Sequence, residues 1–263
     1  METFASVPRP RLVAFDLDGT LLRSDKTTSE RTRKALRGML AKGVELAVAT
    51  ARSPLMIGKL VPPELKDAVW IAHNGAQVLH GGAEFHRCFL ERGILPEVAG
   101  LALEFSPTPL LCVELDGALY SNRDVTHLWG PGFQVVPFQD LPDGTPPKIL
   151  AGLEDCPGFA EALLRTLGPR AQIDVTDAGL YAQIHAPRVA KHHALDEWIR
   201  HRGISWSEVS AFGDDVTDEG MLRLAGWGVA MGNAPERVQA AAKFTTATSD
   251  DDGVARFLER WTQ

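Results

Sequence analysis

The sequence contains little cysteine. Only Cys88, Cys112 and Cys156 occur among the 263 residues, and none of them forms a C-x-x-C pair or a cluster with histidine. An odd number of widely spaced cysteines argues against a disulfide framework and against a structural zinc site. We therefore expect three reduced thiols, as is typical of a cytoplasmic protein.

Long apolar runs and an excess of basic residues are also absent. No apolar stretch approaches the roughly 18 residues that a membrane-spanning helix requires, and residues 1–10 have no apolar signal-peptide core. The formal net charge is −7, whereas nucleic-acid-binding proteins usually carry a basic face. These features predict a soluble, cytoplasmic protein with no nucleic-acid and no membrane partner. They leave the oligomeric state open.

A glycine-rich G-x-G-x-x-G motif does not follow the first predicted strand, which argues against a dinucleotide-binding oxidoreductase. Strands and helices nevertheless alternate along the first part of the chain. Apolar strands are predicted at 12–15, 44–49 and 69–72, and a helix between the first two at 29–42. This alternation predicts a parallel α/β sheet, whose functional residues collect at the carboxyl ends of the strands.

The pattern changes near residue 80. Hairpins are mixed with two helical segments, and the clearest hairpin has the turn dipeptide Asp116-Gly117. The dense prolines and glycines of residues 130–147 predict a loop. Mixed hairpins and helices of this kind are typical of an α+β domain with an antiparallel sheet.

The strand–helix alternation returns after residue 187, beginning with a predicted helix at 191–201. The predicted architecture is therefore a discontinuous core domain with an inserted cap domain. The core comprises residues 1–80 and 188–263, and the cap comprises residues 81–187.

Two carboxylates follow the first predicted strand, in the segment Asp16-Leu17-Asp18-Gly19-Thr20. Phosphoryl transfer needs an oxygen nucleophile and an acid that protonates the leaving oxygen. Asp16 could be the nucleophile, and Asp18 could be the acid. The alternative is an ordinary Asp-Gly turn in which Asp18 caps the backbone.

A second acidic loop, Gly213-Asp214-Asp215-Val216-Thr217-Asp218, follows another predicted strand at 209–212. Carboxylates that meet at one edge of a sheet repel each other unless a cation joins them. Ligands that are all oxygen atoms favour a hard ion such as Mg²⁺. Helix capping is the alternative for the later acidic residues of this loop, but it does not explain Asp214 at the end of the strand.

These segments resemble the haloacid dehalogenase superfamily, specifically the Cof-type phosphatases that carry a large α/β cap after the second motif. The resemblance runs along nearly the whole chain. Its matching segments, in chain order, are Asp16-Leu17-Asp18-Gly19-Thr20-Leu21-Leu22, Ala49-Thr50-Ala51-Arg52, Asn74-Gly75-Ala76, Lys191, Gly213-Asp214 through Asp218, Met221-Leu222 and Met231-Gly232-Asn233-Ala234. The fold that this resemblance implies is a Rossmann-like core with a parallel sheet and an inserted α+β cap.

The resemblance also implies roles for individual residues. Asp16 would attack phosphorus and form an aspartyl-phosphate, and Asp18 would act as the general acid and base. Thr50 and Lys191 would hold the phosphoryl oxygens.

The implied metal ion is Mg²⁺, bound by Asp16, by the backbone carbonyl of Asp18 and by Asp214. Asp218 would orient a water molecule on the metal. Three further residues, Arg52, Asn74 and Asn233, resemble family positions that face the site or the substrate, with Asn233 near the phosphate-binding lysine.

Two positions depart from the family pattern. His192 stands where a glycine usually follows the lysine, and Thr217 stands where an asparagine usually precedes the last aspartate of the acidic loop. Neither change removes a charged group that the implied mechanism needs.

The sequence thus predicts a Mg²⁺-dependent phosphatase. Its partner would be a small phosphorylated metabolite, such as a sugar phosphate, a nucleotide or a phosphorylated cofactor, with the cap selecting the substrate. Two alternatives stay open: a sugar-phosphate phosphomutase, and a non-catalytic binding protein on the same scaffold.

Overall fold

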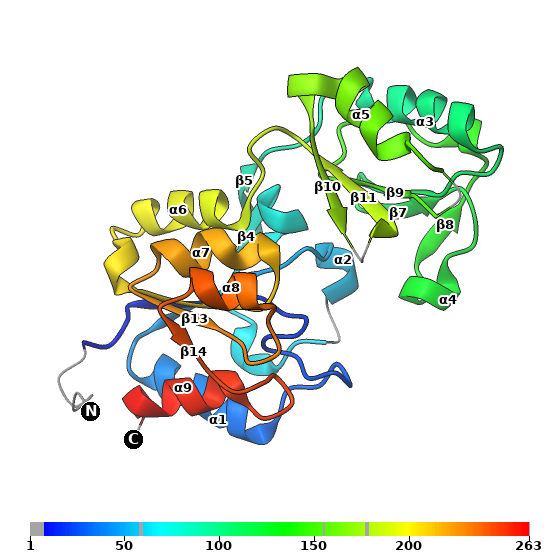
Figure 1. The fold of residues 1–263 in the computed structure, drawn as a ribbon. Helices are drawn as coiled ribbons and strands as arrows, with labels where there is room; N and C mark the ends of the chain where they lie inside the picture. The colour runs from blue at the N-terminus through cyan, green and yellow to red at the C-terminus, as the bar shows by residue number, and fades with distance from the viewer. Residues whose placement is uncertain (1–7, 58–59, 155, 177–178, 263) are drawn as a thin grey trace. The chain divides into compact units, whose positions relative to one another are not determined.

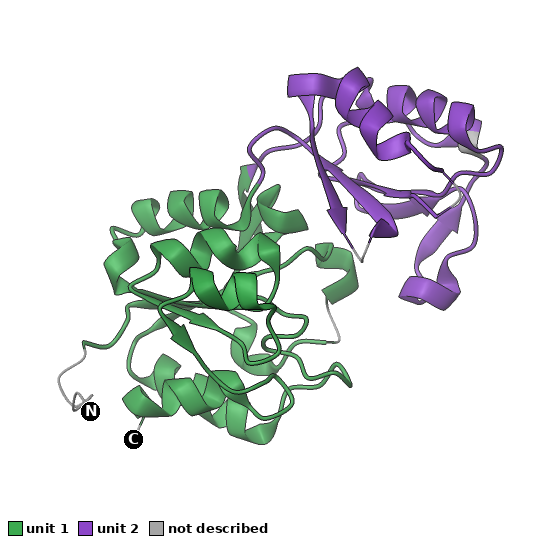
Figure 2. Ribbon diagram, in the orientation of Figure 1, with its two compact units in different colours: residues 1–86, 190–263 green, residues 87–189 purple. Residues whose placement is uncertain are grey.

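A computed structural model of the protein describes residues 8–57, 60–154, 156–176 and 179–262 (Figure 1). The chain divides into two compact units (Figure 2). Unit 1 comprises Met1–His86 and Ala190–Gln263, and unit 2 comprises Arg87–Val189.

The boundary between the units differs from the predicted one. We predicted that the insert begins at residue 81, but strand β5 (Ala83–Arg87) is the edge strand of the sheet in unit 1. Residues 81–86 therefore belong to the core. The hairpin that signalled a change of pattern extends the core sheet and does not begin the inserted domain.

Unit 1 is built on a sheet with the strand order β14-β13-β12-β1-β2-β3-β4-β5 in the described part of the chain. Neighbouring strands from β14 to β3 are parallel, whereas β3 and β4 are antiparallel. The strands other than β5 are β1 (Leu12–Phe15), β2 (Glu45–Ala49), β3 (Val69–Ala72), β4 (Gln77–His80), β12 (Val209–Gly213), β13 (Trp227–Ala230) and β14 (Phe244–Thr245).

Helices cover both faces of this sheet (Figure 1). Helices α1 (Glu30–Ala41) and α9 (Gly253–Thr262) pack with the side chains of Val13 and Phe15. Helices α6 (Lys191–His201), α7 (Glu219–Leu224) and α8 (Glu236–Ala241) pack with Leu12 and Ala14 on the other face. Because successive side chains of a strand point to opposite faces, the central strand β1 is apolar throughout and fully buried.

Local signals account for the helix ends. The hydroxyl of Ser29 accepts a hydrogen bond from the backbone N–H of Thr32 and caps α1. Gly43 follows the helix with a φ of +76°, a conformation that favours glycine. The short helix α2 (Pro54–Ile57) begins after Ser53, whose hydroxyl accepts from the N–H of Leu55. The sequence predicted the helix at 29–42, but it did not predict α8 or β14.

Unit 2 has a separate sheet with the strand order β10-β11-β9-β6-β7-β8. One face packs against helices α3 (Ile94–Phe105) and α5 (Phe159–Leu167). Neighbouring strands of this sheet are antiparallel, except for β7 and β8, which are parallel. The remaining elements are β6 (Leu111–Leu115), β7 (Ala118–Ser121), α4 (Thr126–Trp129), β8 (Phe133–Val135), β9 (Ile149–Gly152), β10 (Gln172–Thr176) and β11 (Tyr181–His185).

Two sequence predictions for unit 2 have different outcomes. The turn dipeptide Asp116-Gly117 joins β6 to β7, with φ angles of 49° and 76° that suit a tight hairpin. The predicted loop at 130–147 is wrong in part, because it contains β8, a three-residue strand too short for a pattern signal.

Among the helices in the described parts of the chain, none has both the length and the apolarity that a membrane span needs.

Candidate active site

The candidate site is built where three neighbouring parallel strands end. Asp16 follows β1, Thr50 follows β2 and Asp214 follows β12, and β1 lies between the other two strands. The backbone continues the strand geometry at two of these positions: the N–H of Asp16 donates to the carbonyl of Phe212 at 3.1 Å, and that of Thr50 donates to Ile71 at 2.8 Å. The sheet therefore fixes the spacing of these side chains.

Lys191 joins two carboxylates from different elements. It is the first residue of α6, and its Nζ donates to Oδ1 of Asp16 at 2.7 Å and to Oδ1 of Asp218 at 2.8 Å. The lysine side chain is 2% exposed, and those of Asp16 and Asp218 are 9% and 0% exposed. A buried charge is tolerated only when it is paired and hydrogen-bonded, as it is here.

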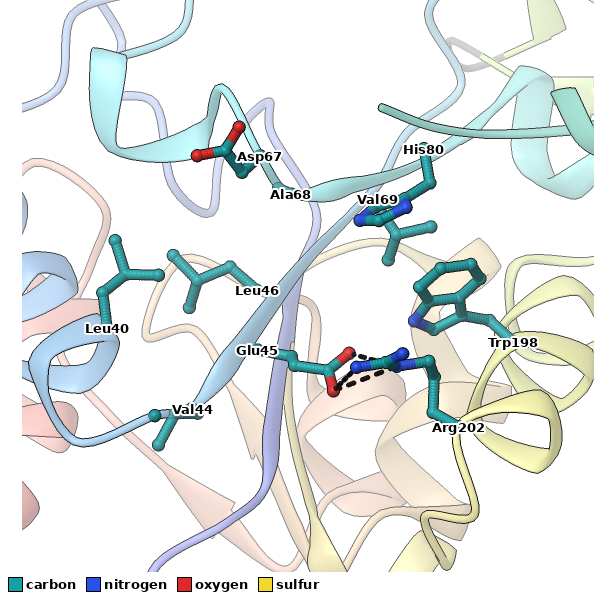
Figure 3. A pocket seen from close by; sticks show the side chains of 11 residues that line it. Leu40, Val44, Glu45, Leu46, Asp67, Ala68, Val69, His80, Trp198 and Arg202 are labelled. Atoms are coloured by element: carbon teal, nitrogen blue, oxygen red, sulfur yellow. Dashed lines mark hydrogen bonds and ion pairs between the residues drawn. The ribbon is translucent and has the colours of Figure 1, made fainter. Parts of the chain in front are cut away.

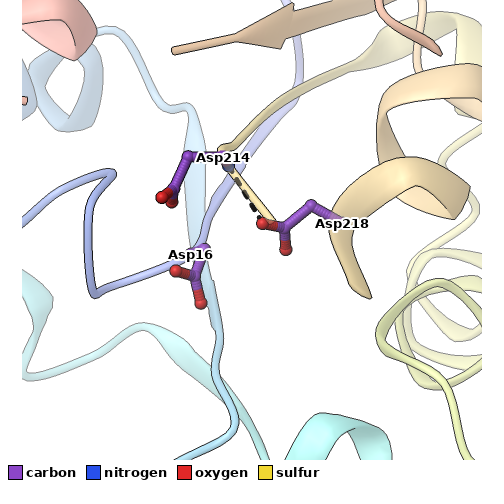
Figure 4. Close-up of side chains that lie close together, drawn as sticks. All are labelled: Asp16, Asp214 and Asp218. Carbon is purple, nitrogen blue, oxygen red and sulfur yellow. Dashed lines mark hydrogen bonds between the residues drawn. The ribbon is translucent and has the colours of Figure 1, made fainter. Parts of the chain in front are cut away.

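The second acidic loop is organised by Asp218. Its Oδ2 accepts a hydrogen bond from the backbone N–H of Asp214 at 3.0 Å (Figure 4). It also accepts one from the backbone N–H of Asp215 at 3.0 Å. Both oxygens of Asp218 thus already accept from protein donors. Asp214 is held by Thr20, whose hydroxyl donates to Oδ1 at 2.6 Å, and it lies with Asp16 and Asp218 in one group.

Close packing around Asp214 requires glycine at position 19. A Cβ atom added to Gly19 would lie 2.2 Å from Oδ2 of Asp214, and the φ of +75° also favours glycine. The close approach that requires glycine here exists only in the folded chain.

The site brings three carboxylates, those of Asp16, Asp214 and Asp218, close to one cation, Lys191. Burial raises the pKa of Asp16 to about 8. Lys191 lowers this pKa, whereas the nearby carboxylates of Asp218 and Asp214 raise it further. Burial likewise raises the pKa of Asp214 to about 6, although the Thr20 hydroxyl opposes it. Burial alone would lower the pKa of Lys191, but the carboxylates of Asp16 and Asp218 raise it. The lysine is therefore a permanent cation that does not fully balance its neighbours.

These residues fit a divalent cation. Asp16, Asp214 and Asp218 each offer one carboxylate oxygen, and these three atoms lie within 4.8 Å of one another. All-oxygen ligands with uncompensated negative charge suit Mg²⁺. Asp218 is the least suited to direct ligation, because Lys191 and two backbone N–H groups occupy its oxygens.

Asp18 makes a separate set of contacts. Its carboxylate accepts two hydrogen bonds from Arg52, at 2.5 and 2.7 Å, and one from Nζ of Lys26 at 2.8 Å. Burial would raise the pKa of Asp18, but the hydrogen bonds from Arg52 and Lys26 lower it to about 2. In this arrangement Asp18 is an ionised carboxylate bound to two cations, and its carbonyl stays a predicted metal ligand.

Arg52 and Asn74 lie in two loops, after β2 and after β3, that are joined by backbone hydrogen bonds. The backbone N–H of Asn74 donates to the carbonyl of Thr50 at 2.9 Å, and that of His73 donates to the carbonyl of Arg52 at 3.1 Å. His73 and Asn74 are buried and both have positive φ angles, 50° and 57°. Such backbone strain is often stored near functional sites.

Asn233 contacts the loop that carries Asp214. It is exposed, and its side-chain nitrogen donates to the carbonyl of Gly19 at 2.9 Å and to Oδ2 of Asp214 at 3.3 Å. These hydrogen bonds help to hold Asp214, and the place of Asn233 near Lys191 stays a prediction.

Sequence reasoning missed two polar residues of this site. Thr20 lies in the first motif, and its hydroxyl binds Asp214, a contact that the sequence does not reveal. Lys26 binds Asp18, but no local sequence signal distinguishes it from a solvated lysine. His192, the departure from the family pattern, packs on α7: a Cβ atom added to Gly220 would lie 2.1 Å from its Nδ1.

A pocket of about 270 Å³ in unit 1 lies away from these residues (Figure 3). It opens near the starts of β2 and β3, and the ion pair between Glu45 and Arg202 lies on its wall. None of the candidate site residues lines it. The carboxylates and Lys191 lie at the opposite edge of the sheet, where the parallel strands end. We therefore place the chemistry at that edge.

Comparison with known proteins identifies the family. The family of haloacid dehalogenase-like hydrolases matches residues 13–258. An HMP-PP phosphatase of Cronobacter sakazakii is 31% identical, with 95% of each chain covered. A 5-amino-6-(5-phospho-D-ribitylamino)uracil phosphatase of Bacillus subtilis is 28% identical, covering 96% of this chain and 98% of the relative.

The fold agrees with this family. The crystal structure of a haloacid dehalogenase-like hydrolase from Bacteroides thetaiotaomicron superposes with a TM-score of 0.86 at 24% identity, covering 96% of this chain and 99% of the other. The predicted α/β fold is confirmed, as is the predicted assignment to the phosphatases of this superfamily. The chain therefore belongs to the haloacid dehalogenase-like hydrolase family.

Proposed function

We propose that this protein hydrolyses small phosphomonoesters in a Mg²⁺-dependent reaction that passes through an aspartyl-phosphate on Asp16. The observation that carries the proposal is the buried position of Asp16, bound to Lys191 and grouped with Asp214 at the ends of parallel strands. A carboxylate in such a place has a nucleophilic oxygen and neighbours able to balance the charge of a phosphoryl group.

In the first step, an oxygen of Asp16 forms a bond to phosphorus while the bond from phosphorus to the leaving oxygen breaks. Lys191 and the hydroxyl of Thr50 would hold phosphoryl oxygens during this transfer. Because Lys191 keeps its charge when buried, it can stabilise negative charge that develops there. Holding one group at the start of α6 and the other at the end of β2 limits the reorganisation that the reaction requires.

Asp18 supplies the proton that the leaving oxygen takes, and it later removes a proton from the water that attacks phosphorus. That second attack releases inorganic phosphate and regenerates Asp16. Because Asp18 is ionised and bound to Arg52 and Lys26 in this structure, its carboxylate must leave these partners and take up a proton from water before it can protonate the leaving oxygen. It returns to the ionised form when that proton is transferred, and this form accepts the proton of the attacking water.

The residues that would hold Mg²⁺ are Asp16 and Asp214, together with the carbonyl of Asp18. The metal would supply positive charge to the phosphoryl oxygens and offset the repulsion among the carboxylates. Asp218 would act through its neighbours, since it fixes Lys191 and the backbone that carries Asp214.

The substrate that we propose is a small phosphorylated metabolite. The relative from Bacillus subtilis is named for a phosphorylated ribitylaminouracil, a molecule of this size. Unit 2, which has a sheet and core of its own, would select the group that carries the phosphate.

Hydrolysis of p-nitrophenyl phosphate with and without MgCl₂ tests the reaction. We expect Mg²⁺-dependent release of phosphate that Asp16→Asn reduces by at least about a thousandfold, because the nucleophile is lost. Asp116→Asn is the matched control: it makes the same change in an Asp-Gly pair of unit 2, in a turn that Asn-Gly also favours.

The intermediate needs its own test. When the reaction is quenched in acid, intact-mass spectrometry should show one added phosphoryl group on Asp18→Asn, because dephosphorylation is slowed in this variant. The double variant with Asp16→Asn should carry none. Activity of the wild-type protein no greater than that of Asp16→Asn would refute the proposed function.

A further inference from the structure

Two cations bind the same carboxylate at the edge of the candidate site. Arg52 donates from Nε and Nη2, and Lys26 donates from Nζ, to the two oxygens of Asp18. The side chains are 24% exposed for Arg52, 49% for Lys26 and 36% for Asp18. A ligand that enters from solvent can therefore reach all three groups.

The proposed chemistry requires Asp18 to leave both cations. Its two oxygens accept three charge-assisted hydrogen bonds, and these are the strong class of such bonds. When Asp18 turns to the leaving oxygen, Lys26 and Arg52 lose the partner that neutralises them. Arg52 is partly buried, so the loss of its partner carries a desolvation cost that water only partly removes.

Nearby acidic groups in the described part of the chain are already bound elsewhere. The pKa of Arg52 is raised mainly by its hydrogen bonds to Asp18 and to a smaller extent by Asp16, and Asp16 is itself bound to Lys191. The carboxylate of Asp25 accepts from the backbone and hydroxyl of Thr27. A second carboxylate to replace Asp18 is therefore missing from the described contacts of Lys26 and Arg52, and the substrate itself can supply one.

We propose that the leaving group of the physiological substrate carries an anionic substituent, a carboxylate or a second phosphate, that binds Lys26 and Arg52 in exchange for Asp18. This inference rests on the proposed function and narrows its substrate class. The substrate is then a phosphorylated acid or a bisphosphate, not a neutral sugar phosphate. Binding of the anion releases Asp18 for proton transfer, so recognition and catalysis are linked through one carboxylate.

Matched probes test this exchange. Glycerol 3-phosphate ends in a hydroxymethyl group where 3-phosphoglycerate has a carboxylate, and the two are otherwise the same. Glucitol 6-phosphate and 6-phosphogluconate differ in the same way on a longer chain. Within at least one pair we expect kcat/KM to be about tenfold higher for the acid, as an added charge-assisted hydrogen bond would give. Lys26→Gln should bring that ratio close to one.

Lys34→Gln is the matched control, because it removes the same charge from an exposed position on α1. This variant should keep the wild-type ratio. Equal kcat/KM for acid and alcohol in both pairs, or a ratio unaffected by Lys26→Gln, would overturn the inference. If Lys26→Gln lowers kcat/KM equally for acid and alcohol, then Lys26 serves the transferred phosphoryl group and the inference is also wrong.

A binding measurement separates this inference from the proposed function. Phosphonoacetate and 2-hydroxyethylphosphonate cannot be hydrolysed as phosphate esters, and they differ in the same way as the other probes. Calorimetry in MgCl₂ should give about tenfold tighter binding for phosphonoacetate to the wild-type protein, and equal binding to Lys26→Gln. A protein without phosphatase activity can still show this difference, whereas equal binding or no binding of both phosphonates counts against the anion site.

Discussion

Lys191 and Asp16 form a buried ion pair, with Nζ 2.7 Å from Oδ1, although 175 residues separate them in the chain. Lys191→Met would leave Asp16 and Asp218 without their shared cation. We expect the free energy of unfolding to fall by about 3 kcal/mol and phosphatase activity to be lost, because removal of one partner leaves a buried charge uncompensated.

Urea unfolding and p-nitrophenyl phosphate assays measure the two effects. Lys34→Met, at an exposed position of α1, is the control and should change stability by less than about 0.5 kcal/mol. An inactive Lys191→Met with unchanged stability would show that the buried pair serves catalysis alone.

Mg²⁺ should stabilise the fold by joining the carboxylates of Asp16 and Asp214. At about a hundred times its dissociation constant, one bound ion adds about 2.7 kcal/mol, which corresponds to a rise in Tm of about 5–10 °C for a chain of this size. Thermal unfolding with and without MgCl₂ measures this shift. Asp214→Asn should lose most of it, whereas Asp215→Asn, which changes an exposed neighbour in the same loop, should keep it.

Gly75 lies in the turn after β3, and its missing side chain lets this turn lie close to the start of α6. A Cβ atom at this position would lie 2.4 Å from the carbonyl oxygen of Ala190, the residue before Lys191, and the φ of +108° also favours glycine. Gly75→Ala should therefore displace Lys191 from Asp16 and lower kcat by at least about tenfold, since small misplacements of a binding group are costly.

Gly43→Ala separates this effect from backbone strain. Gly43 also has a positive φ, +76°, but an added Cβ atom there would meet nothing within 4 Å. This control should lose about 1 kcal/mol of stability and keep the wild-type kcat. Equal kcat values for the two variants would contradict a positioning role of Gly75.

His192 and Gly220 should depend on each other. The imidazole of His192 occupies the space that a Cβ atom of Gly220 would need, with Nδ1 at 2.1 Å. Gly220→Ala should destabilise the protein by about 1–3 kcal/mol through overpacking. In the His192→Ala background the same change should cost much less, with a coupling energy of at least about 1 kcal/mol from a double-mutant cycle in urea. Additive effects would mean that the ring moves aside freely.

The sequence by itself determined the elements whose signals are local. Apolar runs located β1 and β3, the pattern at 29–42 located α1, and Asp116-Gly117 located a hairpin turn. Short or edge elements were missed or misplaced. Strand β8 has three residues and α8 has six, too few for a periodic pattern, and β5 belongs to the core only because it pairs along that sheet.

The residues of the candidate site were also readable from the sequence, because Asp16, Thr50 and Asp214 follow apolar strands, and the ends of parallel strands meet at one edge. What the sequence could not give is which charges pair. Asp16 and Asp18 have the same side chain, yet Asp16 binds Lys191 whereas Asp18 binds Lys26 and Arg52. Only the tertiary structure decided these partners, since an ion pair depends on distances of a few ångströms between segments that the chain brings together when it folds.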